Sequence, residues 1–134
     1  MSEKIRVLLV DDEPAILKTI SKRLELTGYE VITATDGEEG LNQAKLSGPQ
    51  VIILDLMLPK ITGMEVCATL KQDPLHRHIP IIIFTARGGE MDEKLCRECG
   101  ADAYITKAQQ SKALIEQIDI LLTRVLAKRR QESV

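Results

Sequence analysis

Three carboxylates follow two mostly apolar stretches of the chain and offer its clearest chemistry. Asp11 and Asp12 follow the run Ile5 to Val10, and Asp55 follows the run Val51 to Leu54. If both runs are parallel strands, their carboxyl ends meet at one edge of a sheet. Carboxylates about 4 Å apart repel by about 4 kcal/mol at an effective dielectric near 20, unless a cation joins them. Mg²⁺ suits such a cluster because it leaves positions for phosphate oxygens, so the acids predict phosphoryl chemistry.

Five short strand-like runs alternate with segments of helical length and pattern. The runs are Lys4 to Val10, Glu30 to Thr35, Val51 to Leu54, Ile79 to Phe84 and Ala103 to Thr106. This alternation predicts repeated β-α units and an α/β fold with a parallel sheet. The first, third and fourth runs are almost continuously apolar, which is typical of central strands buried on both faces. The second and fifth runs are more polar, and we expect them at the edges.

Capping residues predict where several helices begin. Asp36–Glu39 and Thr62–Glu65 each have an acceptor side chain followed three residues later by a carboxylate, which is capping-box spacing. Asp12 is a cap candidate for the first helix, with Pro14 in its first turn. The last helix is expected to begin near residues 109–111 and to continue to about Gln131.

An apolar stripe runs along that last helix, with members spaced three and four residues apart. Its members are Leu114, Ile118, Leu121 and Val125. We expect the first half of the stripe to face the core. Its continuation into Lys128, Arg129 and Arg130 fits either a dimer seam or a linker.

Composition bounds the class of protein. The 134 residues are the size of one domain, with 44% hydrophobic and 28% charged residues. A net charge of −2 gives no broad basic field, which argues against direct nucleic-acid binding by this domain. The early apolar run is short and nothing approaches transmembrane length, so we expect a cytoplasmic protein with no membrane partner.

The three cysteines are expected to be free thiols. Cys67, Cys96 and Cys99 are an odd number in a chain with no export signal. Cys96 and Cys99 have redox spacing, but they lie late in a predicted helix without a second pair, which favours a packing role. His76 and His78 are interpreted as surface histidines, because the sequence points to no further metal ligands beside them.

Two more residues with useful chemistry close strand-like runs. Thr85 directly follows the fourth run and Lys107 the fifth, so four strand ends supply acids, a hydroxyl and a cation. Taken singly, Thr85 is explained as a strand residue, Lys107 as a solvated charge and Asp12 as a cap. Together, at the ends of four strands, they favour a functional site.

Against this background the chain resembles the receiver domain of two-component response regulators, including the chemotaxis regulators. The resemblance extends from Ile5 to about Leu126. It rests on Leu8-Leu9-Val10-Asp11-Asp12-Glu13, Asp55-Leu56-Met57-Leu58-Pro59 with Gly63, Thr85-Ala86, and Gly100 to Lys107. It implies a flavodoxin-like (βα)5 fold with strand order 2-1-3-4-5 and helices on both faces. Residues 1–127 would be the receiver domain, and 128–134 a basic tail or the start of a linker.

The resemblance also implies a phosphoacceptor and its metal. Asp55 would take a phosphoryl group from a sensor histidine kinase or a histidine phosphotransfer protein. Asp11, Asp12, Asp55 and the backbone carbonyl of Met57 would hold Mg²⁺, or Mn²⁺ as a substitute. The domain would be a signalling phosphoacceptor and not an enzyme with external substrates, although it would assist its own phosphorylation and autodephosphorylation.

The remaining implied roles concern switching. Thr85 and Lys107 would contact the phosphoryl oxygens, and Tyr104 would turn inward with Thr85. Met57 and Arg87 would control attacking water and so the lifetime of the phosphoryl group. The switched surface would be the fourth helix, fifth strand and fifth helix. It would act on a downstream protein or effector domain, or support a phosphorylation-dependent homodimer.

Ala108 departs from the family pattern, which usually has a proline after the lysine, joined by a cis peptide. A cis bond to a non-proline residue costs about 3–4 kcal/mol, so Lys107-Ala108 must be either trans with a rearranged loop or cis and strained. We therefore expect altered coupling between phosphorylation and the surface of the fourth helix. Ala108 is also the only support for an alternative, a receiver-like protein-binding module that does not depend on phosphate.

Two other classes of protein share parts of this pattern. A phosphohydrolase with a nucleophilic aspartate would have a second aspartate two residues after Asp55, where this chain has Met57. A flavodoxin-like FMN protein would have a first loop rich in Ser, Thr and Gly, whereas the acids from Asp11 to Glu13 would repel a phosphate. The sequence identifies neither the kinase nor the downstream partner.

Overall fold

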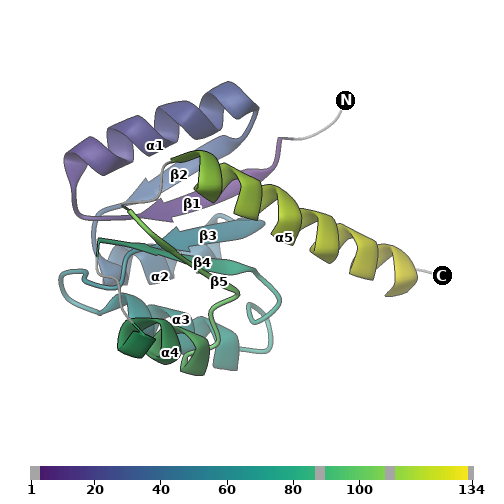
Figure 1. The fold of residues 1–134 in the computed structure, drawn as a ribbon. Helices are drawn as coiled ribbons and strands as arrows, with labels where there is room; N and C mark the ends of the chain where they lie inside the picture. Colours follow the sequence, from purple (N-terminus) through teal and green to yellow (C-terminus); the bar gives the residue numbers. More distant parts are fainter. Residues whose placement is uncertain (1–3, 87–89, 108–110, 133–134) are drawn as a thin grey trace.

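Five parallel strands form a single sheet in the order β2-β1-β3-β4-β5 (Figure 1). The computed structural model describes residues 4–86, 90–107 and 111–132, with side chains given for all of these except 90, 91, 111 and 125–132. The strands are β1 Arg6–Val10, β2 Glu30–Ala34, β3 Val51–Leu54, β4 Ile81–Thr85 and β5 Ala103–Thr106. The predicted fold class and strand order are confirmed, including β2 and β5 as the edges.

Five helices cover the two faces of this sheet in the described residues. They are α1 Pro14–Thr27, α2 Gly37–Leu46, α3 Gly63–Gln72, α4 Glu90–Glu98 and α5 Ser111–Glu132. Helices α1 and α5 lie on one face, and α2, α3 and α4 lie on the other (Figure 1). No helix in the described part of the chain has the length and apolar character needed to span a membrane.

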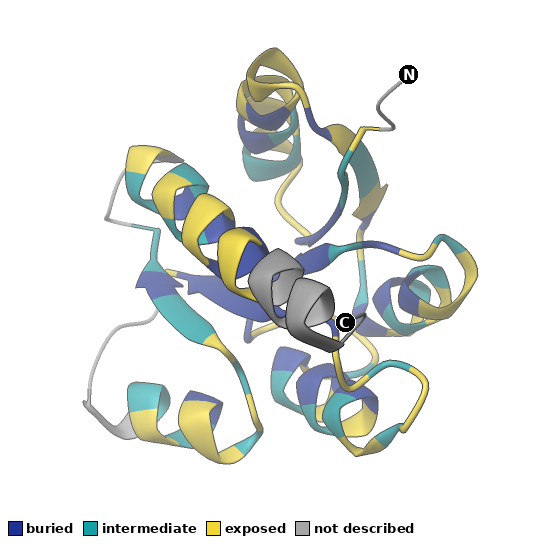
Figure 2. Cartoon of the chain, turned by 90° about the vertical axis from the view of Figure 1, so that its right-hand side faces the viewer, coloured by how far each residue is buried: buried dark blue, intermediate teal, exposed yellow. Residues whose placement is uncertain are grey.

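The apolar runs are continuous because both faces of the central strands are covered. In β1, Val7 and Leu9 enter the core under α1 and α5, whereas Leu8 and Val10 enter the core under α2, α3 and α4. This alternation follows from the two-residue period of a strand. Figure 2 shows the resulting pattern: the central strands are buried, the edge strands β2 and β5 are partly exposed, and the helices have buried and exposed sides.

The predicted caps of α2 and α3 are confirmed. Asp36 accepts a hydrogen bond from the backbone N–H of Glu39 at 2.7 Å, and Thr62 accepts one from Glu65 at 3.2 Å. The prediction that Asp12 caps α1 is wrong. The residue at the cap position is Glu13, which makes no side-chain cap hydrogen bond. Its own N–H donates to Asp11 at 2.9 Å, so Asp11 organises this turn and Asp12 is left exposed.

The first half of α5 packs on the core as predicted. Leu114, Ile118, Leu121 and Leu122 are buried in the cluster beneath α1 and α5. The side chain of Val125 lies outside the described residues, as do those of the basic cluster at 128–130. The helix itself continues to Glu132. The division at residue 127, and the choice between dimer seam and linker, stay predictions.

Candidate functional site

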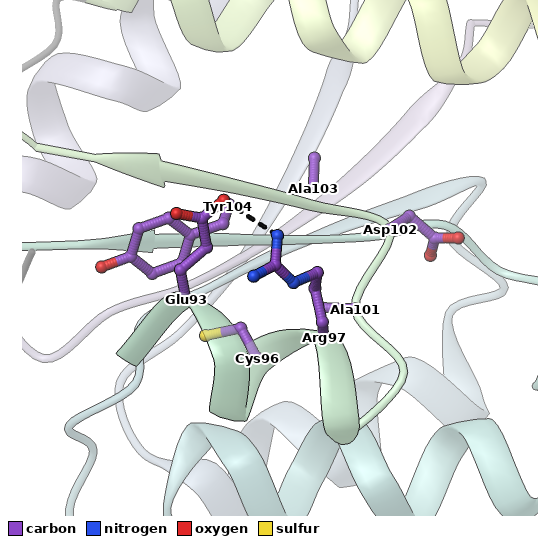
Figure 3. Close-up of a pocket in the computed structure, with 7 residues that line it drawn as sticks. All are labelled: Glu93, Cys96, Arg97, Ala101, Asp102, Ala103 and Tyr104. Atoms are coloured by element: carbon purple, nitrogen blue, oxygen red, sulfur yellow. Dashed lines mark hydrogen bonds and ion pairs between the residues drawn. The ribbon is translucent and has the colours of Figure 1, made fainter. Parts of the chain in front are cut away.

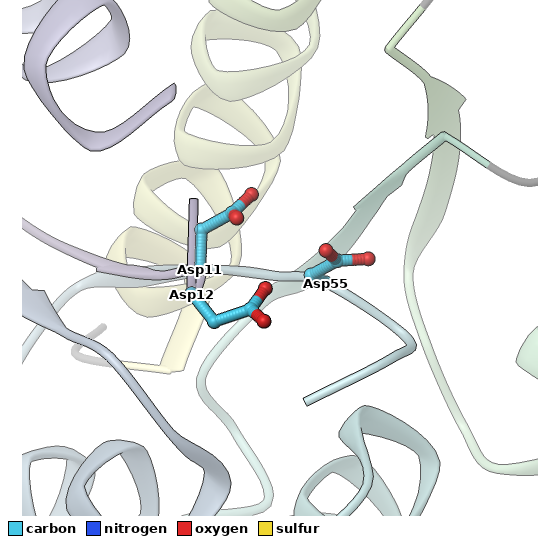
Figure 4. A group of neighbouring side chains, drawn as sticks. All are labelled: Asp11, Asp12 and Asp55. Carbon is cyan, nitrogen blue, oxygen red and sulfur yellow. The ribbon is translucent and has the colours of Figure 1, made fainter. Parts of the chain in front are cut away.

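The register of the central strands brings the predicted acids together. Val10 of β1 lies opposite Leu54 of β3, so Asp11 and Asp55 are the next residues of both strands at the same edge. The backbone N–H of Asp55 also donates to the carbonyl of Val10 at 3.1 Å. Figure 4 shows Asp11, Asp12 and Asp55 side by side, and one carboxylate oxygen from each lies within 4.8 Å of the others.

Lys107 places its ammonium among these carboxylates. It follows β5, and its backbone N–H donates to the carbonyl of Thr85 at 2.7 Å. The Nζ atom lies 2.8 Å from Asp11 Oδ2, 3.1 Å from Asp55 Oδ2 and 3.0 Å from Glu13 Oε1. The side chain is only 9% exposed, so these contacts are largely shielded from solvent. The sequence predicted Lys107 at this site but assigned no role to Glu13.

Burial and pairing act against each other in this cluster. Asp11 is 1% exposed, and burial raises its pKa above the ordinary value even though Lys107 opposes the shift. Burial alone would lower the pKa of Lys107, but its hydrogen bonds to Asp11, Glu13 and Asp55 outweigh that effect and hold the pKa above its usual range. The two shifts therefore have different causes: burial dominates at Asp11, and the paired carboxylates dominate at Lys107.

The donor set fits a hard divalent cation. Asp11 and Asp55 are buried, whereas Asp12 is exposed, so the cluster offers carboxylate oxygens together with access to water. Mg²⁺ prefers this combination of few carboxylates and several waters. Lys107 neutralises one of the negative charges and leaves the site with an excess of them. Met57 lies beside the cluster, and its backbone N–H is 3.4 Å from Asp55 Oδ1.

Thr85 and Tyr104 occupy the neighbouring strands. Thr85 ends β4 and is 1% exposed. Tyr104, in β5, is partly buried and packs against the core beneath α2, α3 and α4. In Figure 3 its ring lies beside α4, at a hollow of about 170 Å³. The hollow is lined by Glu93, Cys96, Arg97, Ala101, Asp102, Ala103 and Tyr104.

Two residues that the sequence singled out lie outside the described residues. Arg87, a candidate for control of phosphoryl lifetime, is one of them. Ala108 is the other, so the prediction about the Lys107-Ala108 peptide stays a prediction. Lys107 itself is described, and its Nζ atom lies 3.1 Å from Asp55 Oδ2; its contact with phosphoryl oxygens stays a prediction.

With this geometry in place, comparison with known proteins defines the family. Residues 7–119 match the response regulator receiver domain family, and the chain belongs to it. The chain is a receiver domain of a two-component system. Among solved structures, the CheY-like receiver domain protein from Methanospirillum hungatei JF-1 has a TM-score of 0.87 at 29% identity. The match covers 94% of this chain and 99% of that one.

Curated relatives are longer proteins. The alkaline phosphatase synthesis transcriptional regulatory protein PhoP of Bacillus subtilis is 43% identical over 119 residues, which are 89% of this chain and 49% of PhoP. The DNA-binding dual master transcriptional regulator RpaA of Synechocystis is 40% identical, again over 89% of this chain and 49% of the relative. The chain therefore spans about half the length of these relatives.

Proposed function

We propose that Asp55 is the phosphoacceptor of this receiver domain and takes its phosphoryl group from a sensor histidine kinase or a histidine phosphotransfer protein. The observation that carries this proposal is the position of Asp55, which is buried at the end of β3 and in contact with the Lys107 ammonium. A carboxylate oxygen of Asp55 attacks the phosphorus while the bond from phosphorus to the donor's nitrogen breaks. The product is an acyl phosphate on Asp55.

The neighbouring residues supply positioning and charge. Lys107 already lies 3.1 Å from Asp55, from where it neutralises negative charge on the transferred group. The Thr85 hydroxyl donates to a phosphoryl oxygen. Mg²⁺, or Mn²⁺ as a substitute, would be held by Asp11, Asp12, Asp55 and the Met57 carbonyl, and it supplies further positive charge to the phosphoryl oxygens.

Phosphorylation then changes which oxygens compete for the Lys107 ammonium. In the structure this ammonium pairs with Asp11, Glu13 and Asp55, and a phosphoryl group on Asp55 adds competing oxygens. Lys107 and Thr85 turn toward the phosphoryl oxygens, and Tyr104 changes its position with Thr85. This movement alters the surface formed by α4, β5 and α5. That surface acts on a downstream protein or effector domain, or on a second copy of the chain, without direct nucleic-acid contact by this domain.

Loss of the phosphoryl group is part of the same proposal. Water attacks the acyl phosphate, and Met57 and Arg87 set how readily it does so. This autodephosphorylation resets the signal, so the domain is a signalling phosphoacceptor and not an enzyme with an external substrate. Its location in the cytoplasm remains a prediction from the sequence.

Intact mass spectrometry tests the phosphoacceptor directly. The purified chain is incubated with Mg²⁺ and a small-molecule phosphodonor, beside a sample with chelator and the variants Asp55→Asn and Asp36→Asn. Asp36 is a matched control because it caps α2 and lies outside the acid cluster. We expect one added phosphoryl group in the wild type and in Asp36→Asn, and none in Asp55→Asn or with chelator. An adduct that persists in Asp55→Asn would overturn the assignment.

A further inference from the structure

The structure brings together two cysteines that the sequence does not pair. Cys67 belongs to α3, and Cys99 lies in the turn that follows α4. The Cys67 Sγ atom lies 3.5 Å from the backbone carbonyl oxygen of Cys99 and donates a hydrogen bond to it. They are separated by 32 positions along the chain. The contact therefore joins two different helical elements on the same face of the sheet.

We propose that Cys67 and Cys99 form a reversible oxidation site, in which Cys99 reacts with a hydroperoxide and Cys67 then closes an intramolecular disulfide. This chemistry stands apart from phosphorylation of Asp55, because it uses neither the acid cluster nor Lys107. It also differs from the pairing that the spacing of Cys96 and Cys99 suggests. The assignment of the two roles follows from the burial of the three thiols.

Cys99 is the thiol that an oxidant reaches first. Cys67 and Cys96 are both 0% exposed, whereas Cys99 is partly accessible. A hydrogen bond from Cys67 lowers the pKa of the Cys99 thiol, which favours the thiolate form of Cys99. The same hydrogen bond, together with burial, raises the pKa of Cys67 well above its ordinary value. The pair thus holds one accessible thiolate beside one buried thiol.

Cys96 does not compete for either role. Burial raises the pKa of its thiol to about 11, which keeps it protonated and a poor nucleophile. Its backbone carbonyl accepts a hydrogen bond from the Cys99 Sγ atom at 3.0 Å. Cys96 is therefore a packing residue, as the sequence indicated, whereas Cys99 is also the reactive thiol of the proposal.

The two oxidation steps need no reactant other than the hydroperoxide. The Cys99 thiolate attacks the peroxide, the O–O bond breaks, and the products are a sulfenic acid on Cys99 and hydroxide or alkoxide. The Cys67 sulfur then attacks the Cys99 sulfur, the S–O bond breaks, and the Cys67 proton leaves with the hydroxyl group as water. The peroxide is reduced, the two thiols are oxidised, and a dithiol reductant reverses the change.

A disulfide at this point would fasten the end of α4 to α3. Cys99 is followed by Gly100, whose φ of 94° turns the chain toward β5. The hollow beside Tyr104 is also lined by Ala101 and Asp102, the two residues that follow Gly100 in the chain (Figure 3). Oxidation would therefore restrict the same end of α4 that borders this hollow.

Thiol counting with peptide mapping tests the site on the wild-type chain. The protein is treated with hydrogen peroxide, unfolded in an alkylating reagent, and analysed by intact mass and by non-reducing digestion. The untreated chain should bind three alkyl groups, one for each cysteine. The oxidised chain should bind one, on Cys96, and yield a Cys67–Cys99 peptide that dithiothreitol separates. Three alkyl groups after treatment, a Cys96–Cys99 peptide or a chain-to-chain disulfide would each overturn the proposal.

Single variants then separate the two roles. Cys96→Ser is the matched control, and it should still form the Cys67–Cys99 peptide. Cys67→Ser should leave a sulfenic acid on Cys99 that a dimedone probe labels, since no thiol remains to resolve it. It should also raise the pH midpoint of Cys99 alkylation relative to wild type, because the hydrogen bond from Cys67 is lost. Unchanged alkylation of Cys99 in Cys67→Ser would show that the two thiols do not interact.

Discussion

Lys107 is the residue on which the metal-free site depends. Its ammonium is the shared partner of Asp11, Glu13 and Asp55, and two of these carboxylates are buried. A buried carboxylate that loses its partner keeps the cost of leaving water without the compensating attraction. The stability of the domain should therefore respond to Lys107 far more strongly than to a lysine on the surface.

Lys107→Met tests this point while it retains the length of the side chain. In chelator we expect the free energy of unfolding, measured by urea denaturation, to fall by about 3–5 kcal/mol. Lys60→Met is the matched control, since Lys60 is 60% exposed and its ion pairs with Asp36 and Glu38 lie at the surface. The control should change stability by less than about 1 kcal/mol. Equal losses in the two variants would contradict a buried shared cation.

Asp11 should make the metal-free domain less stable as the pH rises. Its pKa is raised above 3.8 by burial, so between 3.8 and the higher folded value the native state keeps a proton that the unfolded chain has lost. Raising the pH through this interval lowers the free energy of unfolding. Asp11→Asn removes that contribution, so its stability relative to wild type should increase from acidic to neutral pH in chelator.

Asp36 supplies a control of opposite sign. The hydrogen bond from the Glu39 backbone lowers its pKa below 3.8, so its charge stabilises the fold above that value and the effect is lost on acidification. Asp36→Asn should therefore lose stability relative to wild type as the pH rises from acid to neutral. Urea denaturation at a series of pH values compares the two variants. If the stabilities of Asp11→Asn and Asp36→Asn relative to wild type changed with pH in the same direction, the opposite pKa shifts of Asp11 and Asp36 would be contradicted.

The strand ends explain why most of the site was predictable from sequence. Asp11, Asp55, Thr85 and Lys107 each follow or end an apolar run, and parallel strands place such residues at one edge. Glu13 was missed because its contact with Lys107 depends on the turn between β1 and α1. The Cys67–Cys99 contact was missed for a related reason, because nothing in the local pattern relates α3 to the turn after α4.

At the scale of elements, the start of α3 is fitted closely to the end of β3. Gly63 is the first residue of α3, and its N–H donates to the carbonyl of Leu56 at 2.9 Å. A Cβ atom at this position would lie 1.9 Å from the carbonyl oxygen of Asp55, which is backbone and cannot rotate away. The helix and the proposed phosphoacceptor therefore hold each other in place.

Gly63→Ala should disturb stability and phosphorylation together. We expect a loss of about 1–3 kcal/mol in the free energy of unfolding, because the backbone must shift to admit the methyl group. The rate of Asp55 phosphorylation should fall as well. Gly48→Ala is the control, since its φ of 61° strains an alanine although nothing lies within 4 Å of the added Cβ. The control should lose stability and keep its phosphorylation rate, and a similar rate loss in both would contradict the close fit.

The elements themselves were predicted well because their signals are local. The β3 and β5 bounds agree with the predicted strand-like runs, and the side-chain caps of α2 and α3 are those expected from sequence. The cap of α1 was predicted wrongly, because Asp11 and Asp12 are adjacent and the side chain of either could accept a hydrogen bond from the first turn. Only the folded turn shows that Asp11 accepts the N–H of Glu13.

For the whole molecule, the fold explains how one edge of the sheet can carry the chemistry while the rest of the sheet stays apolar. Both faces of β1, β3 and β4 are packed into the two cores, and this packing positions the residues that directly follow these strands. The chain spans about half the length of PhoP and RpaA. The output that we propose passes through the surface of α4, β5 and α5.

The most direct test of the central claim is the position of the phosphoryl bond itself. The wild-type chain is phosphorylated with Mg²⁺ and a small-molecule phosphodonor, treated with borohydride, digested and mapped by mass spectrometry. Borohydride reduces an acyl phosphate and converts the aspartate to homoserine. We predict homoserine at position 55 alone. Homoserine at Asp11 or Asp12, or a phosphoryl group on any other residue with Asp55 unchanged, would contradict the account.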